Sequence, residues 1–173
     1  MLVLAVDTSG RNGSVALARC AVGCTCELVE VVDLAGGTFS AQLVPQIATM
    51  LSQCGLSKTD IDAFAIVSGP GSFTGLRIGL AAVKALGEIL AKPIAAVSLL
   101  EVVAQGGKGL AAIDAGRGEV YVAEIDGEAM GEQKLLTTPE FLQAAHGLTV
   151  VAFDSNVIHA ARQAEPLPPA KSA

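Results

Sequence analysis

A glycine-rich stretch, Ser68 to Leu80, holds the residue types and spacing that most favour a chemical site. It follows an apolar run, Ala63 to Val67, and leads into a segment with the period of a helix. Pro70 stands between two glycines, so the chain must turn tightly there, because proline restricts φ and glycine accepts positive φ. Thr74 stands where a helix N-cap is expected. The stretch therefore predicts a strand, a sharp corner and a capped helix.

Two interpretations of this corner are open from the residues. The free amides at a helix N-terminus attract anions, and Arg77 lies one turn into the helix, so phosphate binding is the first. The second, which we favour, is a turn that lets the helix pack closely on the strand. A Walker A loop is excluded because no Gly-Lys-Ser/Thr follows the glycines. A serine protease is disfavoured because neither Ser9 nor Ser72 has the His and Asp partners that such a nucleophile needs.

Asp7 and Asp114 are the other candidates for chemistry, because each follows a short apolar run and precedes a turn of small residues that contains an arginine. In an ATP-dependent phosphotransferase, such aspartates would hold a metal ion and the Thr8-Ser9 turn would surround the phosphate. The chain is short for two full lobes around a nucleotide, and no general base stands out. We therefore expect both carboxylates to accept hydrogen bonds from turn amides instead.

The overall composition argues against direct binding to nucleic acid or to a membrane. The formal net charge is −6, the sequence pI is about 4.8 and aromatic residues make up 3% of the chain, so basic stripes and stacking rings are both lacking. Although mean hydropathy is +0.56, no uncharged apolar run is long enough to cross a bilayer. The first residues lack the basic start of a signal peptide. We expect a cytoplasmic protein.

The cysteines, Cys20, Cys24, Cys26 and Cys54, do not have the spacing of a zinc site. The first three flank a predicted hairpin turn, and no histidine lies near them in the sequence. We therefore expect reduced, buried thiols.

The elements that position these residues follow from the hydrophobic periodicity. The first half of the chain predicts an antiparallel meander of three strands, then a helix, a strand, a second helix and a short strand–helix pair: residues 2–6, 14–19, 27–34, 40–54, 63–67, 75–90, 94–97 and 99–105.

The second half repeats this pattern. Residues 109–124 match residues 2–18 as an apolar strand, an aspartate, a small-residue turn and an alternating strand. A third strand follows over residues 130–136, then a helix with Thr138 as its N-cap and Pro139 at its first position. With a last strand and a weak helical pattern, the second copy ends early: residues 149–153 and 159–163. The sequence thus predicts a duplicated βββαβ plan, with lobes over residues 1–106 and 107–160 and a flexible tail over 161–173.

The second helix of the first lobe is more apolar than a helix on one sheet face requires. Its polar residues Arg77, Lys84 and Glu88 fall in one narrow stripe. We expect this helix to be covered on two sides, either within its own fold or by another protein molecule.

Three segments together resemble the TsaB (YeaZ) family over residues 2 to about 153: the Asp7-Thr8-Ser9 start, the glycine-rich stretch, and Ile113 to Tyr121, which reads IDAGRGEVY. The resemblance implies an α/β fold of duplicated actin/Hsp70/sugar-kinase-like (ribonuclease H-like) lobes, with a short second lobe. It implies a non-catalytic subunit of the complex that makes N6-threonylcarbamoyladenosine at position 37 of tRNA. An ATP-dependent phosphotransferase or ATPase of the same superfold remains the alternative.

The partners follow from the same resemblance. A TsaD-like catalytic subunit and a TsaE-like ATPase are expected, with a homodimer when the chain is alone and tRNA reached only through the complex. No cofactor is expected, and no catalytic or metal-binding residue, since the histidines His146 and His159 lie far from each other without carboxylate company.

Family members pair through the first-lobe helices, so the resemblance also implies a partner-binding helical face. We assign to it Leu43, Ile47, Met50, Leu51, Gly75, Leu76, Gly79, Ala82, Val83 and Leu86, with Arg77 and Arg117 as additional polar contacts. Since Gly75, Gly79 and Ala82 leave a flat face for another helix, a bulky residue at position 79 is expected to block assembly and to leave the fold intact.

Overall fold

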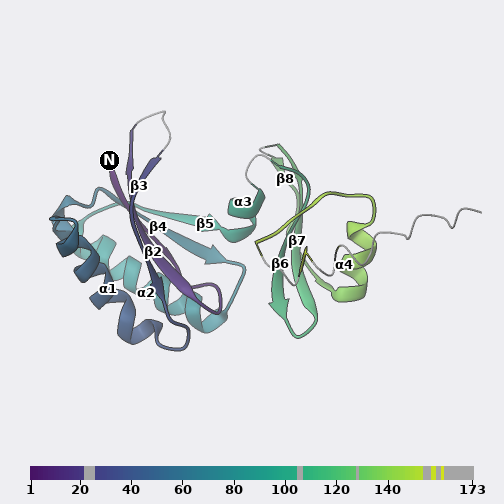
Figure 1. Ribbon diagram of the computed structural model, residues 1–173, viewed down its shortest axis with the longest axis horizontal. Coiled ribbons are helices and arrows are strands. Elements are labelled where there is room, and N and C mark those ends of the chain that lie inside the picture. The colour runs from purple at the N-terminus through teal and green to yellow at the C-terminus, as the bar shows by residue number, and fades with distance from the viewer. Residues whose placement is uncertain (22–25, 105–106, 128, 154–156, 159–160, 162–173) are drawn as a thin grey trace, which may run out of the picture. The chain divides into compact units, whose positions relative to one another are not determined.

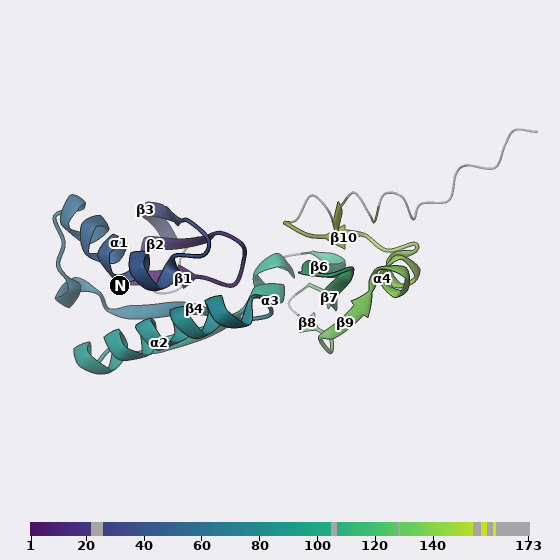
Figure 2. The same cartoon turned by 90° about the horizontal axis from the view of Figure 1, so that it is seen from below.

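The computed structural model describes residues 1–21, 26–104, 107–127, 129–153, 157–158 and 161. The chain divides into two compact units, Met1–Ser98 and Leu99–Ala173, and each is an α/β unit built on a five-stranded sheet (Figures 1 and 2). The sequence places its boundary between residues 106 and 107, whereas the compact units divide after residue 98. The tail from residue 162 onward, and His159 with it, lie outside the described residues.

The first unit contains the predicted elements in order: β1 (Leu2–Asp7), β2 (Gly13–Cys20), β3 (Cys26–Leu34), α1 (Phe39–Gln53), the 3-10 turn η1 (Lys58–Asp60), β4 (Ala63–Gly69), α2 (Phe73–Leu90) and β5 (Ile94–Ser98). The strand order is β3-β2-β1-β4-β5. The predicted antiparallel meander is confirmed, and β4 joins it parallel to β1. Parallel pairing brings the carboxyl ends of β1 and β4 to one edge of the sheet, where the glycine-rich corner begins.

Residues of β1, β2 and β4 mostly alternate between a buried and a half-buried face. Leu4, Leu17 and Phe64 lie side by side in register and belong to the same core cluster as the buried residues of α1 and α2. Both helices therefore cover one face of the sheet. The opposite face carries small residues, such as Ala5 and Ala16, and within the described part of this unit neither helix packs on it. No described helix is long and apolar enough to cross a membrane.

The second unit contains α3 (Leu99–Ala104), β6 (Lys108–Gly116), β7 (Glu119–Asp126), β8 (Ala129–Met130), β9 (Lys134–Thr137), α4 (Thr138–Ala145) and β10 (Val150–Val151). β10 pairs parallel to β6, as β4 does to β1 in the first unit. The duplicated plan is thereby confirmed. The predicted third strand is split into β8 and β9 around Gly131, whose amide donates to the Glu124 carbonyl oxygen at 2.9 Å. Gly131 and Glu132 at this break are poor strand formers.

Both predicted N-caps are wrong by one or two positions. The N-cap of α2 is Ser72, whose hydroxyl accepts from the Gly75 amide at 3.3 Å, while Thr74 lies in the first turn. The N-cap of α4 is Thr137, which shares a capping box with Glu140. In each case the N-cap is a hydroxyl residue that lies earlier in the chain than the threonine predicted from the sequence.

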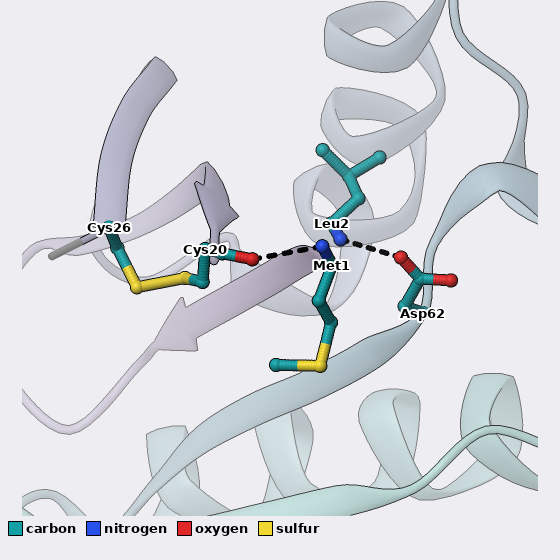
Figure 3. The surroundings of a disulfide bond; sticks show 5 residues. All are labelled: Met1, Leu2, Cys20, Cys26 and Asp62. Carbon is teal, nitrogen blue, oxygen red and sulfur yellow. Dashed lines mark hydrogen bonds between the residues drawn. A yellow bond between two sulfur atoms is a disulfide. The ribbon is translucent and has the colours of Figure 1, made fainter. Parts of the chain in front are cut away.

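The expectation of reduced, buried cysteines is wrong for two of the four. Cys20 and Cys26 form a disulfide between the paired ends of β2 and β3 (Figure 3). A hairpin register makes the last residue of one strand and the first residue of the next direct neighbours, which sequence spacing alone did not show. Cys54 is a free, half-buried thiol, and Cys24 lies outside the described residues.

Candidate functional site

The glycine-rich corner packs α2 directly onto the end of β1. The Ser72 amide donates to the Ser9 carbonyl oxygen at 2.6 Å, and the Thr8 hydroxyl donates to the Gly75 carbonyl oxygen at 2.8 Å. Gly75 has no room for a side chain, because a Cβ there would collide with the Thr8 carbonyl oxygen, and at Gly79 it would collide with the Thr8 hydroxyl. These contacts agree with the favoured interpretation of the corner as a device for close packing.

The two aspartates accept hydrogen bonds from their turns, as expected from the sequence. One carboxylate oxygen of Asp7 accepts from the Ser9 amide at 2.8 Å and from the Ser9 hydroxyl at 2.6 Å. Asp114 accepts from the Gly116 amide at 2.7 Å. Among the described residues, no group of three or more His, Cys, Asp or Glu side chains could hold a metal ion.

Most of the predicted partner-binding residues on α1 and α2 are buried in the core of the first unit. Those that are buried include the whole set from α1 and three from α2: Leu43, Ile47, Met50, Leu51, Gly75, Gly79 and Val83. The half-buried ones are Leu76, Ala82 and Leu86. The flat glycine face of α2 therefore packs against the sheet and the Thr8 turn of its own unit. The side chains that these helices leave to solvent are different ones.

The exposed side of α2 carries both apolar and charged residues. Phe73 is 73% exposed at the start of the helix and Ile89 is 75% exposed near its end. Arg77 lies with its guanidinium carbon 5.2 Å from the centre of the Phe73 ring, a cation–π contact on the surface. We call the exposed residues of this helix the α2 outer face: Phe73, Thr74, Arg77, Ala81, Lys84, Ala85, Glu88 and Ile89. Sequence reasoning included only Arg77 of this set, because it took the apolar positions with helical spacing as interface when they form the core.

Arg117 occupies a tight turn in the second unit. It links β6 to β7 with a left-handed backbone, φ +57°, and its side chain is exposed. Gly116 and Gly118 on either side also have positive φ. The turn presents Arg117 to solvent, and we keep its role as a polar contact as a prediction.

A hollow of about 380 Å³ in the second unit was not predicted. Its apolar wall includes Leu110, Val122 and Leu136, and Glu124 and Lys134 stand among its polar lining residues. The lining comes from separate strands and α4. The hollow could not be predicted from the sequence because its lining residues come together only through strand register, which makes Leu110 the partner of Glu124.

Comparisons with known proteins agree with the residues that carry the resemblance. A family model described as TsaD, tRNA N6-adenosine threonylcarbamoyltransferase, matches residues 33–154. The tRNA threonylcarbamoyladenosine biosynthesis protein TsaB of Bacillus subtilis is 35% identical over 126 residues, and that of Escherichia coli is 36% identical over 138 residues. The solved structure of YeaZ from Pseudomonas aeruginosa superposes with a TM-score of 0.65 and 30% identity, covering 80% of this chain and 70% of that one. The chain belongs to the TsaB/YeaZ family.

The matches cover a larger share of this chain than of its relatives. The Bacillus subtilis match covers 70% of this chain and 53% of the relative, and the Escherichia coli match covers 76% and 58%. The chain thus spans little more than half the length of these TsaB/YeaZ relatives. A further solved Pseudomonas aeruginosa protein, described as similar to the peptidase YeaZ, has 32% identity and a TM-score of 0.63, covering 79% of this chain and 67% of that one.

Proposed function

We propose that this chain is a non-catalytic partner subunit in the synthesis of N6-threonylcarbamoyladenosine at position 37 of tRNA, and that it pairs with a TsaD-like catalytic subunit. The observation that carries the pairing is the α2 outer face, on which Phe73 and Ile89 are 73% and 75% exposed. We place the protein contact on this face because large apolar side chains stand exposed on it beside the charged ones. The biosynthetic role rests on the names of the TsaB relatives.

The non-catalytic part of the proposal is supported by the contacts at the corner. One carboxylate oxygen of Asp7 accepts from the Ser9 amide and hydroxyl, and the Thr8 hydroxyl donates to the Gly75 carbonyl oxygen of α2. With a net charge of −6, the chain is expected to meet tRNA through the complex, because phosphates bind to cationic surfaces.

Assembly can be tested by light scattering behind size exclusion, with the chain alone and with its cognate TsaD-like subunit. We expect a homodimer alone and a 1:1 complex after mixing. Phe73→Asp should abolish the 1:1 complex with the fold intact, because the ring is on the surface. Phe153→Asp is the matched control, since Phe153 is 71% exposed in the second unit. A Phe73→Asp chain that still binds the TsaD-like subunit as well as the control does would refute the assigned surface.

The biochemical role needs a separate measurement. Synthesis of the modified nucleoside should require the TsaD-like subunit and a TsaE-like ATPase, and should fall when this chain is omitted or carries Phe73→Asp. ATP turnover by the chain alone would instead support the phosphotransferase alternative.

A further inference from the structure

We propose that Cys20 and Cys26 form a reversible thiol–disulfide switch that controls the order of one end of the first sheet. The two residues are register partners at the ends of β2 and β3, with their Cα atoms 4.1 Å apart. This inference goes beyond the proposed function, which makes no use of the cysteines.

The disulfide lies at the end of a row of contacts that crosses the sheet (Figure 3). The Met1 amine donates to the Cys20 carbonyl oxygen at 2.9 Å, and the Cys20 amide donates to the Met1 carbonyl oxygen at 2.8 Å. The Leu2 amide donates to the Asp62 carboxylate at 2.7 Å, and the Asp62 amide donates back to the Leu2 carbonyl oxygen at 2.8 Å. The row therefore ties β3, β2, β1 and the entry to β4 to one another.

A small thiol reagent can reach the pair. Cys26 is exposed, Cys20 is half-buried, and β3 is an edge strand of its sheet. Edge strands present unpaired backbone groups and open more readily than central ones. Cys54, by contrast, is a half-buried thiol after α1 and has no disulfide.

The chemistry balances with glutathione as the co-reactant. To open the disulfide, a glutathione thiolate attacks one cysteine sulfur and releases the other cysteine as a thiolate. A second glutathione thiolate then attacks the glutathione sulfur of the mixed disulfide and releases the remaining cysteine as a thiolate. The products are two protein thiols and one glutathione disulfide, and the reverse sequence closes the bond. If the chain works in tRNA modification, which rests on the proposed function, it meets an intracellular glutathione pool, where disulfides are usually transient or redox-sensing.

The structural consequence is local. When the bond is closed, it holds the last register pair of the edge strand and, through Cys20, the Met1 end of β1. When it opens, the backbone hydrogen bonds hold this end unaided and it frays. The carboxyl end of β1, where Ser9 meets α2, lies at the far end of the strand, so hydrogen exchange there should not change.

The experiment uses the full chain with Cys24→Ser and Cys54→Ser, so that only the proposed pair can react. Protein equilibrated in mixtures of reduced and oxidised glutathione is alkylated and weighed by mass spectrometry, and its hydrogen exchange is followed. We expect one reversible transition between two alkylated thiols and none. Exchange in residues 2–4 and 26–29 should rise several-fold on reduction, and should stay constant in residues 64–67. Adding Cys20→Ser gives the matched control, which should exchange like the reduced protein in every mixture.

Three results would overturn the proposal. The pair could stay oxidised in every mixture, which would make it a fixed cross-link, or stay reduced in every mixture. It could also titrate with no change in exchange, which would separate the bond from the order of the sheet. Because the measurement contains neither tRNA nor a TsaD-like subunit, its failure is distinct from failure of the proposed function.

Discussion

The two units of this chain share one strand–helix plan but bury their side chains differently. The first packs large residues, including Leu4 and Phe64, on one face of its sheet against two long helices. The second has separate core clusters, one containing Phe141 of α4 and the other containing Leu100 of α3. The same topology therefore produces two kinds of surface. Among the described residues, the long helix with large exposed apolar side chains at its two ends, α2, lies in the first unit.

The helices are also seated in different ways. α2 approaches its sheet through glycines, because Gly75 and Gly79 let the helix backbone contact the Thr8 turn. α4 is placed by the buried Phe141 side chain and by its capping box. A larger side chain in place of a glycine of α2 should therefore destabilise the first unit. A smaller side chain in place of Phe141 should destabilise the second.

The largest effect is expected from Gly79→Leu. A Cβ at this position collides with the Thr8 hydroxyl and lies 3.2 Å from Ile66 Cδ1, so we expect loss of at least about 4 kcal/mol of stability in the first unit. This replaces the expectation from sequence that the substitution spares the fold. Urea denaturation measures the change, with the exposed Ala81→Leu on the same helix as control. Equal midpoints for the two variants would contradict the seating of α2 on glycine.

Phe141→Ala should produce the next largest effect, and in the other unit. The ring is fully buried in the cluster beneath α4, and its loss should cost about 3–5 kcal/mol. Hydrogen exchange resolved by peptide should show loss of protection in β6 and β7 with β1 and β4 unchanged. If protection fell equally in both units, their cores would be coupled, which would contradict the description of two separately packed units.

The smallest effect is expected at the two capping boxes, one in each unit. Hydrogen bonds from the Thr137 hydroxyl and amide lower the pKa of Glu140, and bonds from the Ser57 amide and hydroxyl lower the pKa of Asp60. A lowered carboxyl pKa adds stability that is fully present above the ordinary pKa and is lost as pH falls through the folded-state value.

Thr137→Ala should cost about 1 kcal/mol at neutral pH and should return the pKa of Glu140 toward its ordinary value. The pKa of Asp60 in the other unit should not move, which makes it the internal control. Titration followed by NMR measures both carboxyls. A Glu140 pKa that ignores the substitution would show that the capping hydrogen bonds are not its cause.

Much of the fold could be predicted because it depends on local patterns. The alternation of strand residues and the repeated aspartate turns at Asp7 and Asp114 predicted the order of elements and the duplication. The N-caps were misplaced because a second hydroxyl residue lies just before each predicted one, Ser72 before Thr74 and Thr137 before Thr138, and residue type does not distinguish them. The partner face was the least predictable part, because helical spacing identifies an apolar stripe but does not say what covers it.

The set of elements, their repeat and the family could be read from the amino-acid sequence, since they follow from periodicity and from residues adjacent in the chain. Packing in three dimensions determined which stripe of α2 meets the sheet, because that depends on where Thr8 lies against Gly75 and Gly79. It also decided that Cys20 and Cys26 are bonded, because strand register brings their side chains together. Both outcomes depend on distances between segments, which neighbouring residues do not encode.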